Sequence, residues 1–240
     1  MTTNSPAPAT TFPFSDAFVR VAEPHAAWGA EQLETFNAFV PTGPWSADLD
    51  RRLYQQGGCD LRISILGSYD ESDGSWLWGW ANPGFRDSPA VGAAQRLRQF
   101  GQAHGVREFT EEGLVLSGCT DPRMAVETLA FAAMGVLGAA GYIGVQASPD
   151  ARLYMVPDDP QVPLAAPDPV TLPRMLLTGA GVHPGGSARS VVTGYFDRHR
   201  LPQRPGPDRI TADLPSGSTV EVSFDNAGRI ASVEVGAIRA

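Results

Sequence analysis

Residues 67–82 read GSYDESDGSWLWGWAN, a polar segment that leads into three tryptophans at alternate positions. Side chains alternate between the two faces of a strand, so Trp76, Trp78 and Trp80 are expected to share one face. The six residues before this stretch, LRISIL, also alternate, and the polar segment between the two runs contains Gly74, which favours a turn. The sequence therefore predicts an antiparallel β-hairpin around which the rest of the chain is organised.

Three tryptophans on one face of a strand need a cover. Each buried tryptophan removes roughly 150–250 Å² from water, so the exposed stripe would match or exceed the largest apolar patches usual on monomers. Packing of a helix from the same chain against the stripe is the ordinary explanation. The alternative is an aromatic platform for a ligand or a partner, whose candidate binding residues are Tyr69, Trp76, Trp78, Trp80 and Asn82.

The same stretch resembles the signature of an uncharacterised bacterial family of domains of unknown function. The shared features are Gly-Ser-Tyr at residues 67–69, a polar loop, and Ser-Trp-Leu-Trp-Gly-Trp-Ala-Asn-Pro at residues 75–83. Gly-x-x-His-Gly near the end of the next helix is similar to the family pattern and occupies residues 101–105, whereas Gly79 departs from the alanine usual there. The resemblance covers about residues 17–157, and it supports the expected fold of this region and implies no activity.

Composition and charge exclude several classes of partner. The chain has 240 residues and a formal net charge of −8 at pH 7, whereas nucleic acids and anionic membranes attract basic surfaces. All 18 basic residues are arginines, and the missing lysine excludes Schiff-base catalysis and a phosphate-loop lysine. We therefore expect neither a nucleic acid nor a membrane as a partner.

The N-terminal residues and the cysteines indicate a cytoplasmic protein. Residues 1–13 lack the apolar core of a signal peptide and are predicted to be a disordered lead. Cys59 and Cys119 are too few for a disulfide scaffold, so we expect free thiols, although one bridge is geometrically allowed. The uncharged run 129–145 is marginal in length for a membrane span, and a buried helix that leads into a strand is the expected structure.

Proline content divides the chain into two expected domains. Residues 14–157 are predicted to form an α+β domain, an antiparallel sheet built on the tryptophan hairpin and packed by helices. Residues 158–172 are a proline-rich linker, and residues 173–240 are predicted to form a small module of a helix and three strands that docks on the first domain. The helices expected in the first domain lie at 24–40, 88–104 and 122–138.

Local signals set the bounds of several elements. Ser88 and Asp121 each precede a proline and are expected to cap the helices that follow. The helix after Asp121 is apolar nearly all round, which is typical of a buried helix. Residues 45–55 are expected to hold the first strand, and residues 179–186, GAGVHPGG, are expected to form a glycine-rich loop.

Sequence motifs assign neither a catalytic residue nor a metal site. The four histidines lie on different predicted elements, and His-Glu-x-x-His, Cys-x-x-Cys and Gly-x-Ser-x-Gly do not occur in the sequence. His183 is the one histidine whose setting resembles an active-site loop, because it lies within the glycine-rich segment. No cofactor is expected, since this segment lacks both the dinucleotide-binding order of glycines and a lysine.

The leading hypothesis for the function is a non-catalytic, cytoplasmic protein-interaction protein: an adaptor, a chaperone-like protein or an immunity-type partner of another protein. It rests on the acidic charge, the two-module layout and the missing catalytic motifs. The alternative is a small-molecule binder or an enzyme whose pocket lies between the sheet and the loop at 179–186, with His183 as the acid–base residue. The identity of the partner or ligand does not follow from the sequence.

Overall fold

The computed structural model describes residues 14–182 and 186–237. The lead predicted over residues 1–13 and the candidate His183 lie outside the described residues. In the described part, helices pack against two sheets in which every strand pair is antiparallel. The fold is therefore α+β, as predicted.

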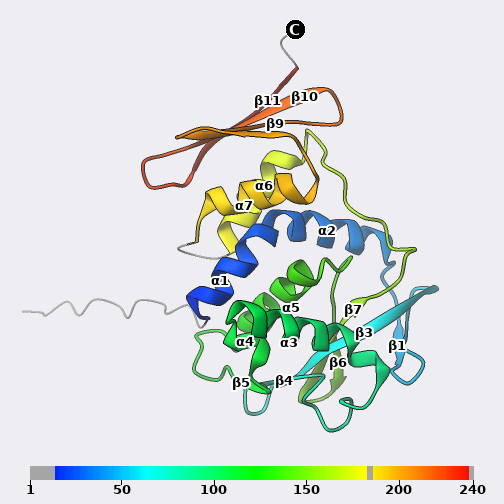
Figure 1. Cartoon of the computed structure of the whole chain (residues 1–240). Helices are drawn as coiled ribbons and strands as arrows, with labels where there is room; N and C mark the ends of the chain where they lie inside the picture. Colours follow the sequence, from blue (N-terminus) through cyan, green and yellow to red (C-terminus); the bar gives the residue numbers. More distant parts are fainter. Residues whose placement is uncertain (1–13, 183–185, 238–240) are drawn as a thin grey trace, which may run out of the picture.

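Figure 1 shows how the elements follow one another along the chain. The helices are α1 (Asp16–Ala22), α2 (Ala26–Phe39), α3 (Gly92–His104), α4 (Arg107–Thr110), α5 (Pro122–Leu137), α6 (Leu172–Val182) and α7 (Ala188–Arg198), with short 3-10 turns η1 (Glu23–His25) before α2 and η2 (Pro89–Val91) before α3. The strands are β1 (Trp45–Asp48), β2 (Leu53–Gln56), β3 (Cys59–Asp70), β4 (Ser75–Trp78), β5 (Gly113–Val115), β6 (Ile143–Ser148), β7 (Ala151–Pro157), β8 (Gln203–Pro205), β9 (Arg209–Asp213), β10 (Ser218–Phe224) and β11 (Ile230–Ala237).

The larger sheet is built on the predicted tryptophan hairpin. β3 and β4 pair antiparallel, and the turn between them contains Gly74 at a φ of 71°, a left-handed conformation that favours glycine. The strand order is β1-β2-β3-β4-β5, with β7 paired to β3 and β6 paired to β7. Because β3 pairs with three strands, the hairpin forms the centre of the sheet.

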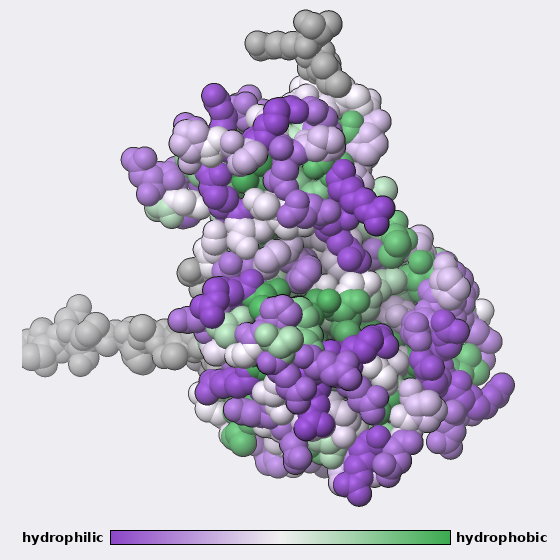
Figure 2. All heavy atoms as spheres, in the orientation of Figure 1, coloured by the Kyte–Doolittle hydropathy of each residue, from purple (hydrophilic) through white to green (hydrophobic). Residues whose placement is uncertain are grey.

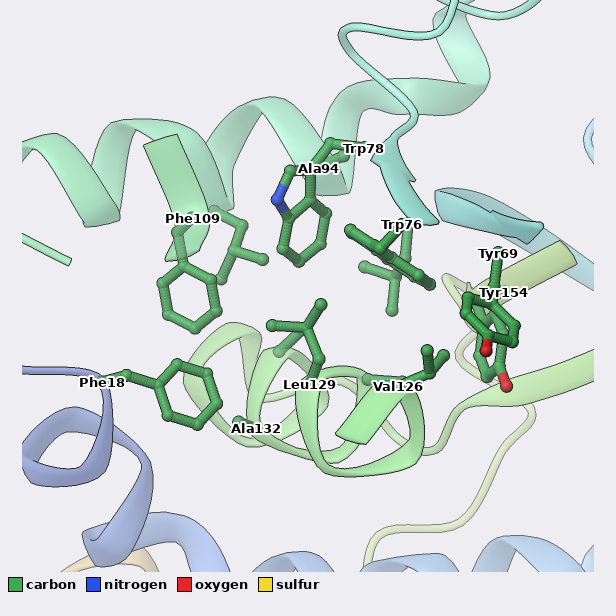
Figure 3. Close-up of a cluster of buried hydrophobic side chains, with 14 of the residues drawn as sticks. Phe18, Tyr69, Trp76, Trp78, Ala94, Phe109, Val126, Leu129, Ala132 and Tyr154 are labelled. Atoms are coloured by element: carbon green, nitrogen blue, oxygen red, sulfur yellow. The ribbon is translucent and has the colours of Figure 1, made fainter. Parts of the chain in front are cut away.

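The tryptophan stripe is covered by helices of the same chain. Trp76 and Trp78 are completely buried. The strand ends at Trp78, so Trp80, which was expected on the same strand, lies in the turn that follows, where it is 8% exposed. Figure 3 shows the indole rings of Trp76 and Trp78 directed toward Val126 and Leu129 of α5. The indole nitrogen of Trp78 also donates a hydrogen bond to the backbone oxygen of Glu108 in α4. Core packing is therefore the alternative that the structure shows, and the stripe offers no open aromatic platform.

The helices form the middle of a layered molecule (Figure 1). The four-stranded sheet, in the order β11-β10-β9-β8, lies at one end, and α6 and α7 lie beneath it. Helix α2 comes next, followed by α5 and α3 and then by the larger sheet. The residues Ala26, Ala27 and Trp28 pack into the core of the four-stranded sheet, whereas Phe36 and Val40 pack into a core of the larger sheet. One helix thus contributes to the cores on both sides.

Three boundaries differ from the sequence prediction. The single strand expected at 45–55 is a hairpin, β1–β2, because the chain turns between the two strands with Arg52 at a φ of 56°. The C-terminal module contains two helices and four strands: the sequence indicated only a short helix at residues 173–178 where α6 lies, and it did not predict the short strand β8. The glycine-rich loop expected at 179–186 is helical as far as Val182, since α6 includes its first four residues.

The proline-rich linker is fastened to α2 by a buried glutamine. The side-chain nitrogen of Gln32 donates to the backbone oxygens of Ala140 and Pro163 at 2.9 and 3.0 Å. Its side-chain oxygen accepts a hydrogen bond from the backbone nitrogen of Ala165 at 2.8 Å. Because Gln32 is fully buried and uses both ends of its amide, it holds the linker in one position.

The outer surface on the face shown in Figure 2 is mostly hydrophilic. Hydrophobic residues gather at the waist between the C-terminal module and the main body. Within residues 14–182 and 186–237, no helix combines the length and the apolar character needed to cross a membrane.

Candidate functional site

A cavity of about 670 Å³ lies between α2, α5 and α6, and we call it the helix pocket. Its apolar wall is formed by Ala30, Leu33, Met124, Phe131, Gly181 and Val182. Its polar wall is formed by Glu34, Asn37, Glu127, Thr128, Tyr142 and Thr178. Ligand sites in proteins typically occupy about 300–1,000 Å³ and combine apolar walls with a few polar groups.

Helix α5 has one face in the core and one face at the helix pocket. The helix begins at its predicted cap, because the Asp121 side chain accepts a hydrogen bond from the backbone nitrogen of Met124. Met124, Thr128 and Phe131 follow one another at helical spacing and line the pocket. Met124 is 61% exposed, although the apolar sequence of this helix predicted burial all round. An exposed apolar side chain beside a cavity is typical of a binding surface.

The polar end of the helix pocket is organised around Glu127. One carboxylate oxygen accepts hydrogen bonds from Arg123, at 2.6 and 2.9 Å, and from the Tyr154 hydroxyl at 2.9 Å. The other oxygen accepts from the Tyr142 hydroxyl at 2.8 Å. Burial, with a further contribution from the nearby Glu127 charge, raises the pKa of Tyr142 and the pKa of Tyr154. Both hydroxyls therefore keep their protons and hold the carboxylate in place.

Helix α6 closes the pocket from the side of the C-terminal module. Arg174 of α6 and Glu34 of α2 form a two-pronged ion pair, one contact of which is 2.8 Å long. A Cβ added at Gly181 would meet no atom within 4 Å, so there is open space beside this part of the wall. Leu177, one turn before Gly181 on the same helix, is 54% exposed.

The candidate binding residues taken from the sequence lie elsewhere. Tyr69 is 4% exposed and belongs to the same buried cluster as the three tryptophans, so these four side chains line no open surface. Asn82 donates to the Ser68 hydroxyl at 3.1 Å and accepts from the backbone of Gly84, so it braces the turn after β4. A partner could reach the buried residues only if the core opened.

The described histidines are engaged in packing or hydrogen bonds. Burial, with a smaller effect from the Arg198 charge, lowers the pKa of His25 to about 4. A ring nitrogen of His104 lies 2.9 Å from the backbone oxygen of Phe100, at the end of α3. A ring nitrogen of His199 lies 2.8 Å from the buried carboxylate of Glu31. Within the described ranges, no group of three or more histidine, cysteine or acidic residues could hold a metal ion.

Both cysteines are free thiols, as expected from the sequence. Cys59 and Cys119 are half-buried and form no disulfide. Burial raises the pKa of the Cys59 thiol and the pKa of the Cys119 thiol. A raised pKa reduces the fraction of thiolate at neutral pH, which makes both groups weaker nucleophiles than an ordinary cysteine.

The larger sheet and the helices that cover it correspond to a known family. Residues 19–160 match the family of unknown function described as DUF6882. No curated protein and no solved structure matches the chain. The matched region ends shortly after β7, so it contains the α2 and α5 walls of the helix pocket and excludes α6. Since this match covers more than half of the sequence and agrees with the uncharacterised domain expected from the tryptophan motif, the chain belongs to the DUF6882 family.

Proposed function

We propose that the protein binds an uncharged, mainly apolar small molecule in the helix pocket. The observation that carries this proposal is the pocket itself, with its volume of about 670 Å³ and its apolar wall next to a fixed polar end. This corresponds to the small-molecule alternative in the sequence analysis, with a different location. The pocket lies between helices, whereas the sequence analysis expected a position between the sheet and the loop at 179–186.

Charge at the pocket favours an uncharged ligand. Glu34 and Glu127 are the acidic residues of the wall, and arginines neutralise both. The side-chain amide of Asn37 has no hydrogen-bond partner among the described residues, so it can donate to and accept from a ligand. The ligand class that fits is an apolar body with one hydrogen-bonding end near Asn37.

The same geometry supports binding more than catalysis. Glu127 accepts hydrogen bonds from Arg123, Tyr142 and Tyr154, which occupy both of its oxygens. A general base takes a proton from the substrate directly, whereas this carboxylate is ion-paired with Arg123 and held by two tyrosine hydroxyls. We therefore propose a cytoplasmic binding protein in which the Glu127 cluster shapes the pocket.

A fluorescence titration with the neutral apolar dye N-phenyl-1-naphthylamine tests the proposal. The wild-type chain is expected to bind the dye saturably at one site. Gly181→Leu places a branched side chain in the open part of the wall and is expected to weaken binding by about tenfold or more. Gly181→Ala is the matched control, because it makes the same change in the helix backbone and fills little of the pocket.

Equal affinity of the wild type and Gly181→Leu would contradict the proposal. If the wild-type chain did not bind the dye saturably, the proposal would be contradicted as well. Circular dichroism and thermal melting of each variant separate loss of binding from loss of folding. Both substitutions replace a helical glycine, so the folded chain is expected to become slightly more stable in each case.

A second candidate function is the leading expectation from the sequence, the non-catalytic binding of another protein. The exposure of Met124 and Leu177, at 61% and 54%, favours it, because large exposed apolar side chains often mark interaction surfaces. Native mass spectrometry of tagged chain drawn gently from its host tests this candidate. Suppose that another protein co-purifies at fixed stoichiometry, and that Leu177→Glu abolishes this co-purification but leaves dye binding intact. That result would support the protein-binding function over the small-molecule function.

A further inference from the structure

A second cavity, of about 550 Å³, lies where the end of α2 meets the β1–β2 hairpin and β6. We call it the hairpin pocket, and its lining includes Asn37, Thr42, Trp45, Tyr54, Gln56 and Gln146. Aromatic and amide side chains are prominent in this lining, whereas the helix pocket has a mainly aliphatic wall. Asn37 and Tyr142 are common to both pockets, so the pockets are neighbours, and they differ in chemistry.

Trp45 provides an open aromatic surface in the hairpin pocket. It is 41% exposed, whereas the other four tryptophans of the chain are at most 8% exposed. One face of its ring system stacks on Tyr54, with centroids 6.2 Å apart and planes 20° apart. Tyr54 is buried, and its hydroxyl donates a hydrogen bond to the side chain of Gln56. One face of the indole is thus covered by Tyr54, and the other face is available to a ligand.

Polar groups without partners lie around this aromatic surface. Among the described residues, neither the Asn37 amide nor the Thr42 hydroxyl has a hydrogen-bond partner. Both groups can donate and accept, which is the capacity needed to bind hydroxyl groups. A ligand here therefore has a face for stacking and several neutral polar substituents at its edge.

The charges in the hairpin pocket narrow the class of ligand further. Arg152 is the cationic residue in the lining, and it is already engaged within the protein. Its guanidinium donates to the Gln146 side chain at 2.6 Å and to the Gly144 backbone at 3.3 Å, and it lies 4.0 Å from the carboxylate of Glu71. Within the described part of the chain, the Nε of Arg152 has no hydrogen-bond partner but is buried, and the other two guanidinium nitrogens already donate to acceptors of the protein, so a phosphate or carboxylate would have to compete for them. The chemistry therefore fits an uncharged ligand.

We propose that the hairpin pocket binds a neutral sugar, with one ring stacked on Trp45. The axial C–H bonds of a sugar ring form an apolar face that packs on the electron-rich face of an indole. The equatorial hydroxyls then point outward, toward Asn37 and Thr42. A cavity of about 550 Å³ is large enough for a disaccharide. The two proposed sites share the Asn37 amide, but the sugar site is built on Trp45 and needs no ligand in the helix pocket.

Two-dimensional ¹⁵N NMR of the full chain tests the sugar site. The Trp45 signal is identified among the five indole N–H signals by its loss in Trp45→Phe. The probes are maltose, cellobiose and N,N′-diacetylchitobiose at up to about 10 mM. At least one of these sugars is expected to shift the Trp45 signal saturably, while the signals of the four buried tryptophans stay in place. If none of the three sugars shifts the Trp45 signal, the proposal is wrong.

Variants separate stacking from general surface effects. Trp45→Ala is expected to weaken sugar binding by about tenfold, and Trp45→Phe, which keeps an aromatic ring, by a smaller factor. Trp45 is half-exposed at the edge of the sheet, so the Trp45→Ala chain should still fold, as thermal melting would show. Gly181→Leu is the matched control, since it fills only the helix pocket and should leave sugar binding unchanged. Adenosine is the comparison probe. If it shifted the Trp45 signal at a lower concentration than any of the sugars, the sugar assignment would be overturned.

Discussion

Buried carboxylates join residues that are far apart in the sequence. Glu108 accepts hydrogen bonds from the backbone and hydroxyl of Ser15 at 2.6 and 2.8 Å, across 93 residues. Glu23 accepts from the backbone of Ser187 at 2.9 Å, across 164 residues. A buried charge needs such partners, because its removal from water is otherwise costly. The sequence does not reveal these pairs, since nothing in the local pattern around a glutamate names a partner on another helix.

His25 gives the chain a predictable loss of stability in acid. Burial lowers its pKa from 6.5 to about 4 in the folded chain. As the pH falls below 6.5, the unfolded chain therefore takes up this proton first, and stability is lost between pH 6.5 and about pH 4. Between pH 7 and pH 4.5 the loss from this one group is roughly 2–3 kcal/mol.

Urea unfolding of the wild type and of His25→Gln at both pH values measures this contribution. Protonation of the carboxylates affects both chains alike, so the difference between them isolates the histidine. The wild type should lose more stability than His25→Gln as the pH is lowered. Parallel losses in the two chains would show that His25 is not protonated more readily in the unfolded state.

At the scale of elements, strands and caps were predictable where local chemistry decides them. The β3–β4 hairpin and the caps at Ser88 and Asp121 were predicted from turn and capping residues, and the structure confirms them. Helix α6 was predicted only in part, because Gly179 and Gly181 lower helix propensity and indicated a loop. Tertiary packing overrides that propensity, since α6 lies against α2.

The candidate site was predictable only in its general position. The sequence placed a ligand pocket next to residues 179–186, and the last turn of α6 does line the helix pocket. The opposite wall was missed, because an apolar helix such as α5 reads as buried on every side. Met124 instead lines the helix pocket and is 61% exposed. The hairpin pocket was missed because Trp45 and Tyr54 were placed on one strand, whereas they lie on two paired strands and their rings stack diagonally across the hairpin.

Two glycines of α6 should respond in opposite directions to the same substitution. A Cβ at Gly179 would lie 2.5 Å from the backbone nitrogen of Ala27, so Gly179→Ala forces α6 away from α2. This overpacking is expected to cost ~1–3 kcal/mol despite the better helix propensity of alanine. A Cβ at Gly181 meets open space, and Gly181→Ala is expected to stabilise the chain by up to about 1 kcal/mol.

Chemical unfolding of the two variants next to the wild type checks this pair. Both variants carry the same substitution in the same helix, with the same change in helix propensity. A difference in stability between them therefore reports the contact of Gly179 with α2. If Gly179→Ala were as stable as Gly181→Ala, the close approach of the two helices would be refuted.

At the scale of the whole molecule, α2 makes the two expected domains interdependent. Trp28 is 2% exposed and packs with α6, α7 and the four-stranded sheet, although it lies in the segment assigned to the first domain. The sequence analysis placed the domain boundary in the linker at 158–172, where the composition changes. A change in composition marks a candidate boundary, but it cannot show that a helix before the linker is shared by the cores on both sides.

We therefore predict that the full chain unfolds in one cooperative transition. In differential scanning calorimetry, the calorimetric and van't Hoff enthalpies should agree. Glu31 of α2 accepts a hydrogen bond from the buried Tyr195 hydroxyl of α7 at 2.8 Å, and burial raises the pKa of Tyr195, so that the hydroxyl stays a donor. Glu31→Ala removes this acceptor and is expected to lower the free energy of unfolding by about 1–3 kcal/mol, still in one transition.

Glu34→Ala is the matched control for the junction between the two halves. Glu34 lies three residues further along α2 and also contacts the C-terminal module, through Arg174 of α6, but at an exposed position. Exposed ion pairs contribute little, so this variant should melt close to the wild type. Two resolved transitions in the wild-type chain would mean that the halves fold separately in spite of the shared helix. If Glu31→Ala melted like Glu34→Ala, the buried hydrogen bond would not hold α7 on α2, and apolar contacts such as those of Trp28 would have to account for the junction.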